Sequence, residues 1–96
     1  MIGPHYAASK AALNGLVHAL AKPLAPYGVT VNAVAPALIE TDMLPGDAEE
    51  RARLVANIPV GRFGKPEEVA QAVLSLIANP YVTSQVMLVD GGMYPR

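Results

Sequence analysis

The chain has 96 residues, of which seven are basic and eight acidic, and this balance argues against a nucleic-acid-binding protein. It contains no cysteine, which excludes disulfides, thiolate catalysis and a cysteine zinc site. It has neither the ~20-residue apolar run of a membrane span nor a signal peptide, so we expect one cytoplasmic domain over residues 1–96.

The first predicted element is a helix that begins near Tyr6. Pro23 lacks a backbone donor and crowds the preceding turn, so we expect the helix to end near Lys22 or to kink there. Its apolar residues recur at helical spacing, and they are Leu13, Leu16, Val17, Leu20 and Leu24.

A β-branched and almost uncharged run follows over residues 29–35. This run predicts a strand buried on both faces, as in a parallel sheet, and Pro36 stops it. After a loop over residues 37–46, Asp47 is a good N-cap for a second helix. The apolar face of that helix extends to Ile58, and Pro59 ends it.

The third helix is predicted to begin at Pro66, because proline fits the first helical position. Asn79 and Pro80 end it. Residues 85–89 have the pattern of a second strand, and a turn with two glycines follows. This order of elements predicts an α/β fold with two parallel strands and three helices. The apolar stripe of the third helix consists of Val69, Val73, Leu76 and Ile77.

Two residues at the front of the first helix suggest acid/base chemistry. Tyr6 and Lys10 are four residues apart, a spacing that stacks them on one face of a helix. A free phenol has a pKa near ~10, and a nearby ammonium group lowers such a pKa. The pair can therefore exchange a proton with a carbonyl or an alcohol, although the same spacing also occurs at ordinary exposed helix starts.

Five motifs occur in order along the chain: Tyr6-Ala-Ala-Ser-Lys10-Ala-Ala-Leu13, then residues 28–36, 39–43, 61–70 and 89–93. Together they resemble the short-chain dehydrogenase/reductase family, most of all its members that reduce 3-oxoacyl thioesters or related small carbonyls. The resemblance covers nearly the whole chain but only the C-terminal part of the family's fold. It implies the last portion of a Rossmann-like, doubly wound parallel sheet.

The resemblance also implies roles for individual residues. Tyr6 is then the catalytic acid/base, while Lys10 hydrogen-bonds the nicotinamide ribose and lowers the pKa of the tyrosine. The segment from Pro36 to Thr41 follows the carboxyl end of a strand, where ligands bind in open parallel sheets. There the Ile39 backbone pairs with the nicotinamide carboxamide, and Thr41 bonds the same amide or a phosphate. The implied cofactor is NAD or NADP, and the implied substrate is a small carbonyl or alcohol.

The sequence departs from the family pattern at several points. Ala37 and Ser84 stand where the family usually has glycine. The chain also lacks the family's Gly-rich phosphate loop and its catalytic Ser with an Asn partner. These absences predict that the chain is inactive alone and needs a missing N-terminal half or a homo-oligomer. A hydrophobic content of 52% also favours such a partner.

Two other functions remain compatible with the sequence. The first is a non-enzymatic remnant that acts as a homo-oligomeric assembly module. The second is a small-molecule-binding module that uses the loop from Pro36 to Thr41. No metal is expected, because His5 and His18 have no neighbours in the sequence that suggest a metal site or a catalytic triad. A Tyr6→Phe change separates the enzyme from the assembly module, because only the enzyme loses turnover.

Overall fold

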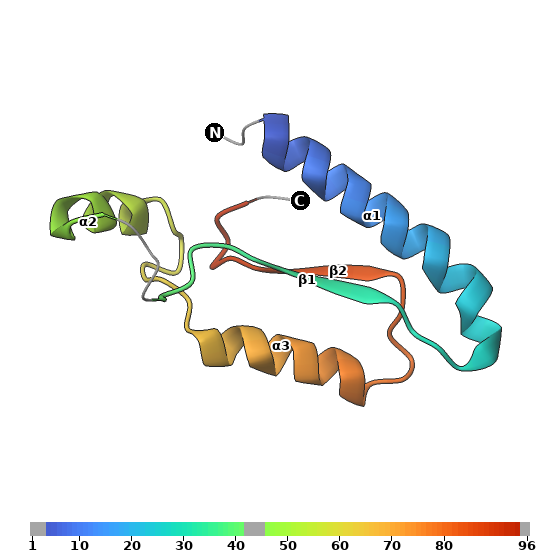
Figure 1. The fold of residues 1–96 in the computed structure, drawn as a ribbon. Coiled ribbons are helices and arrows are strands. Elements are labelled where there is room, and N and C mark those ends of the chain that lie inside the picture. Colours follow the sequence, from blue (N-terminus) through green and yellow to red (C-terminus); the bar gives the residue numbers. More distant parts are fainter. Residues whose placement is uncertain (1–3, 42–45, 95–96) are drawn as a thin grey trace.

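A computed structural model describes residues 4–41 and 46–94 of the chain, and for Tyr6 it describes the backbone alone. The elements follow one another in the order helix, strand, helix, helix, strand (Figure 1). Their bounds are α1 Pro4–Leu24, the short 3₁₀ helix η1 Ala25–Tyr27, β1 Asn32–Pro36, α2 Ala48–Ala56, α3 Pro66–Ala78 and β2 Gln85–Val89.

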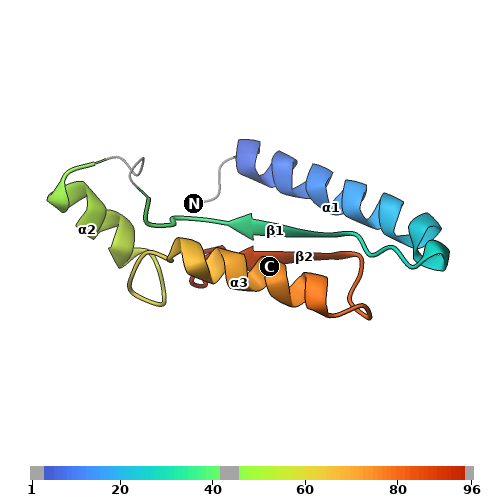
Figure 2. The same ribbon diagram turned by 60° about the horizontal axis from the view of Figure 1, so that its bottom comes forward.

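The two strands form a parallel sheet with a helix on each side. Their register runs from Asn32 opposite Gln85 to Pro36 opposite Val89. Helix α1 packs over one face of this sheet and α3 over the other (Figures 1 and 2). The predicted α/β fold and the parallel strand direction are therefore confirmed.

Helix α1 is longer than predicted at both ends. It begins at Pro4, where a proline costs no helical hydrogen bond. It continues through Pro23 to Leu24, two residues beyond the expected end near Lys22. Pro23 lies in the last turn of α1, and the chain tightens into η1 directly after Leu24.

Strand β1 begins at Asn32, later than predicted. The preceding residue, Val31, donates its N–H to Thr83 Oγ1 at 3.0 Å and accepts at its carbonyl from the Ser84 N–H at 2.8 Å. Burial on both faces is also wrong, since β1 is half-buried and its last residue, Pro36, is exposed. A helix packs over each face of the sheet, so the exposure comes from the edge of β1 that has no neighbouring strand within the described residues.

The starts of α2 and α3 follow their sequence signals. Asp47 caps α2, because its carboxylate accepts from the Glu50 N–H at 2.9 Å. Pro66 is the first residue of α3, as predicted. Helix α2 ends at Ala56, where Asn57 caps it, so Ile58 lies beyond the helix and Pro59 does not end it.

The core is small and has two parts. Val17 and Ala21 of α1, with Leu76 of α3 and Val86 of β2, are buried around the sheet. Ile58 and Phe63 are buried in the connection between α2 and α3. Other residues of the predicted apolar stripes are exposed because no further strand or helix covers them, and these are Leu16, Leu20, Val73 and Ile77.

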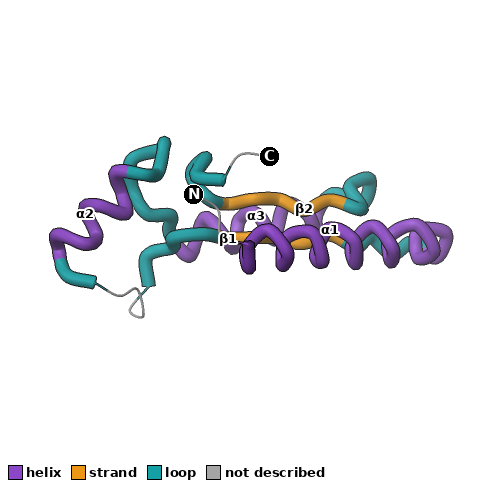
Figure 3. The backbone as a smooth tube through the Cα atoms, turned by 90° about the horizontal axis from the view of Figure 1, so that it is seen from above, coloured by secondary structure: helices purple, strands orange, loops and turns teal. Residues whose placement is uncertain are grey.

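Helix α2 stands at one end of the molecule, beyond the ends of both strands (Figures 1 and 3). No described helix combines the length and apolar character that a membrane crossing requires.

Candidate active site

Two loops meet at the carboxyl ends of the strands. Ile39 and Gly64 form an isolated parallel bridge. In this bridge the Gly64 N–H donates to the Leu38 carbonyl at 3.1 Å, and the Glu40 N–H donates to the Gly64 carbonyl at 2.7 Å. The segment after β1 is therefore fixed to the segment before α3 by backbone hydrogen bonds.

The bridge leaves the peptide groups of Ile39 itself unused. In a parallel pair the central residue of a bridge directs its own N–H and C=O to the opposite side, here away from Gly64. Neither group has a partner among the residues that the structure describes. Ile39 thus presents one backbone donor and one backbone acceptor side by side.

The other residues that the sequence analysis assigns to the cofactor site, Pro36 and Thr41, lie along the same segment. Pro36 ends β1, and Ala37 donates its N–H to the Val89 carbonyl at 3.1 Å. Leu38 adopts a positive φ of 54°, and Thr41 is exposed. A cavity of about 140 Å³ opens beside Ala37 and Leu38 at the strand ends.

The start of α1 lies at the same end of the molecule. Helix α1 runs opposite to the strands, so its first turns lie over their carboxyl ends (Figures 1 and 2). Tyr6 and Lys10 are both on α1, and the Lys10 side chain is half-buried. The Tyr6 side chain lies outside the described part of the structure, as do residues 42 and 43 of the motif over residues 39–43.

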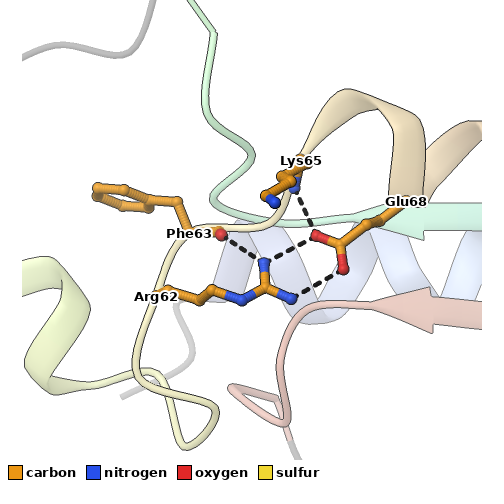
Figure 4. Close-up of polar contacts among 4 residues, drawn as sticks. All are labelled: Arg62, Phe63, Lys65 and Glu68. Carbon is orange, nitrogen blue, oxygen red and sulfur yellow. Dashed lines mark hydrogen bonds and ion pairs between the residues drawn. The ribbon is translucent and has the colours of Figure 1, made fainter.

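A charged network of Arg62 and Glu68 lines the same cavity, and sequence reasoning missed it (Figure 4). Arg62 donates from Nη1 to Glu68 Oε1 and from Nη2 to Oε2, both at 2.8 Å. The Lys65 backbone N–H also donates to Glu68 Oε1 at 2.8 Å. These contacts, the Arg62 hydrogen bonds first, lower the pKa of Glu68 from 4.5 to about 2. The only sequence signal is an acidic residue in the first turn of a helix.

The chain is similar in sequence and in structure to known proteins. A family model described as enoyl-(acyl carrier protein) reductase matches residues 2–94. A solved short-chain dehydrogenase/reductase from Serratia marcescens superposes with a TM-score of 0.81 at 39% sequence identity, covering 92% of this chain and 37% of that one. The chain belongs to the short-chain dehydrogenase/reductase family.

Its relatives include named reductases. Carbonyl reductase family member 4 of Danio rerio is 57% identical over 88 residues, which are 92% of this chain and 36% of the relative. The 3-oxoacyl-(acyl-carrier-protein) reductase of Thermotoga maritima is 52% identical over 94 residues, or 93% of this chain and 37% of that protein. The crystal structure of a 3-oxoacyl-(acyl-carrier-protein) reductase from Brucella melitensis superposes with a TM-score of 0.85 at 41% identity, covering 99% of this chain and 37% of that one.

The chain therefore spans a little more than a third of the length of the family members it matches, 36% and 37% in these cases. The predicted family is confirmed, and so is the prediction that only part of it is matched. The Rossmann-like relationship of the fold is confirmed by the same superpositions.

The histidines of this family member do not form a site of their own. His5 is exposed, and the exposed His18 of α1 contacts the hydroxyl of Ser84, the residue before β2. Within residues 4–41 and 46–94, no cluster of His, Cys, Asp or Glu side chains could hold a metal ion.

Acid should weaken the Arg62–Glu68 network. The pKa of folded Glu68, about 2, lies below its ordinary value of 4.5, so its contribution to stability is present above pH 4.5 and is lost as the pH falls towards 2. We expect Glu68→Gln to lower the free energy of unfolding at about pH 7 and to have little effect at about pH 2. Urea denaturation followed by circular dichroism at both pH values measures this.

Glu67→Gln is the matched control, since Glu67 is exposed and adjacent to Glu68 in the same helical turn. If the free energy of unfolding of both variants changes equally with pH, the Arg62–Glu68 network does not contribute to stability.

Proposed function

We propose that the chain is the C-terminal part of an NAD(P)-dependent oxidoreductase that interconverts a small carbonyl compound and its alcohol. The family membership and the reductase names of its relatives support this proposal. The substrate class that we favour is a 3-oxoacyl thioester, because relatives from Thermotoga maritima and Brucella melitensis are named for that reduction.

The observation that carries the proposal is the backbone of Ile39. Its N–H and C=O face away from the Ile39–Gly64 bridge at the carboxyl end of β1. A carboxamide has one acceptor oxygen and a donor NH₂ group, so it matches this pair. Residues 37–41 thus fit the nicotinamide end of a dinucleotide, with Thr41 exposed close by for a further hydrogen bond.

The proton chemistry is assigned to α1. When bound, the nicotinamide supplies or accepts the hydride. In the reductive direction Tyr6 donates its phenolic proton to the carbonyl oxygen, which becomes the alcohol hydroxyl. Lys10, one helical turn further on and half-buried, hydrogen-bonds the nicotinamide ribose and favours the phenolate of Tyr6.

The residues that bind the nucleotide end of the cofactor are assigned to another part of the protein. The chain has no Gly-rich loop for a pyrophosphate, so we assign the nucleotide end to an N-terminal half or to other subunits of a homo-oligomer. Exposed apolar side chains on both helical layers support a partner, with Leu16 57% exposed on α1 and Ile77 74% exposed on α3. We place this assembly in the cytoplasm, in accordance with the cysteine-free composition.

The same exposed side chains favour a second candidate, an assembly module without turnover. In that case the chain provides surfaces for a homo-oligomer, and Tyr6 and Lys10 are inherited without use.

A chimera tests the proposal. Residues 2–94 replace the matching segment of the Thermotoga maritima reductase, and NADPH oxidation is followed with a 3-oxoacyl thioester as substrate. We expect turnover within about tenfold of the parent enzyme, which corresponds to about 1.4 kcal/mol in the barrier. A folded chimera of the parent's oligomeric state that fails to oxidise NADPH would favour the assembly module.

A further inference from the structure

Helix α2 is the least supported element of the fold. None of its residues is buried, and it packs against no other helix or strand of the described chain. Figures 1 and 3 show it standing apart from the layers formed by α1, the sheet and α3. At its C-terminal end, the buried Ile58 follows it and fixes the chain there. Its orientation over the loops therefore requires a further contact.

Arg51, at the middle of α2, supplies that contact. Its Nη2 donates to both carboxylate oxygens of Glu40. The same group lies over the ring of Phe63, with its central carbon 5.0 Å from the ring centroid. The Arg51 side chain is 30% exposed, and its two partners differ, since the Glu40 side chain is 49% exposed and Phe63 only 9%.

The two partners of Arg51 belong to the paired loops of the candidate site. Glu40 donates its N–H to the Gly64 carbonyl, and Phe63 directly precedes Gly64. One side chain of α2 therefore binds both loops at the point where they are hydrogen-bonded to each other.

We propose that Arg51 is a positioning residue, which holds α2 in a fixed orientation on the paired loops 38–40 and 63–64. A planar guanidinium is suited to this role, because it can hydrogen-bond a carboxylate at its edge and lie with its face on a ring at once. Lysine can do only one of these well. The placement of α2 by Arg51 does not depend on the proposed redox activity.

A matched control exists in the same helix. Arg53 pairs with Glu49 at 3.5 Å, and this pair joins two residues of α2 to each other. Both side chains are largely exposed, at 66% and 82%. Arg53→Gln therefore removes an arginine–glutamate pair from α2 without removing a link to the loops.

Hydrogen–deuterium exchange of the whole chain, read on peptides from α2, tests the proposal. Arg51→Gln is expected to raise exchange in α2 about tenfold, because an ion pair and a cation–π contact are lost together. Arg53→Gln should change it less than about threefold, as expected for an exposed helical pair. Arg51→Lys should fall between Arg51→Gln and the unmodified chain. Exchange in β1 and β2 should stay unchanged, showing that the fold is retained.

The unmodified chain provides a second measurement that does not depend on any variant folding. Salt screens a partly exposed ion pair, so α2 exchange should rise with sodium chloride in the unmodified chain and respond less in Arg51→Gln. The double variant Glu40→Arg with Arg51→Glu, which restores opposite charges, should recover part of the protection. Equal α2 exchange in Arg51→Gln and Arg53→Gln, or an equal salt response with and without Arg51, would overturn the proposal.

Discussion

Replacing Tyr6 by Phe is expected to lower the turnover of the chimera at least about a hundredfold, the usual contribution of a positioned general acid. The change removes the phenolic hydroxyl and keeps the ring, so the packing of α1 should be little affected. The loss should appear in kcat, because the proton is transferred in the chemical step. Steady-state NADPH oxidation at saturating substrate measures it.

Tyr27→Phe is the control for this prediction. Tyr27 lies in η1, with its side chain 80% exposed at the opposite end of α1 from Tyr6. It also loses a phenolic hydroxyl, and we expect its activity to stay within about twofold of the unmodified chimera, the usual scatter for an exposed site. If the two variants have equal activity, Tyr6 is not the acid/base.

Replacing Gly91 by Ala is expected to lower the free energy of unfolding by about 3 kcal/mol, the combined cost of a left-handed backbone and of overpacking. Gly91 has a φ of 63°, and a Cβ built there would lie 2.7 Å from Ile58 Cγ2. Ile58 is only 4% exposed and has little room to move. Urea denaturation of the chain, followed by circular dichroism, measures the change.

Gly61→Ala separates the two causes. Gly61 also has a positive φ, 88°, but a Cβ there would meet nothing within 4 Å. We expect this variant to lose about 1 kcal/mol, the backbone cost alone. A loss in Gly91→Ala no larger than in Gly61→Ala would mean that Ile58 is not packed against Gly91.

Local signals in the sequence predicted several boundaries correctly. The apolar run over residues 85–89 became β2 without a change of bounds. Asp47 and Pro66 mark the starts of α2 and α3, because an N-cap carboxylate and an N-terminal proline act through the backbone of the next turn. The expected parallel direction followed from the order of helices and strands.

Burial could not be predicted from the same patterns. The stripes of α1 and α3 have helical spacing, yet Leu16 and Ile77 are exposed. Periodicity shows which residues can share an apolar face, whereas coverage depends on the neighbouring elements. With one strand beside β1 in the described chain, part of each stripe is left open.

The candidate site was also predictable only in part. The segment from Pro36 to Thr41 was predicted from its position after a strand, a local property. The contacts of Arg51 with Glu40 and Phe63 join residues from three separate segments, and no spacing in the sequence reveals them. The pairing of Tyr6 with Lys10 and the contact of Thr41 with a cofactor stay predictions.

The fate of the hydride tests the central claim most directly. The chimera is supplied with a 3-oxoacyl thioester and with NADPH that carries deuterium at both C4 positions of the nicotinamide, and the product is analysed by mass spectrometry. We predict an alcohol that carries deuterium on the former carbonyl carbon, formed at a rate that depends on Tyr6. A folded chimera that forms no alcohol, or forms it without deuterium, would contradict the assignment of this chain to a nicotinamide-dependent oxidoreductase.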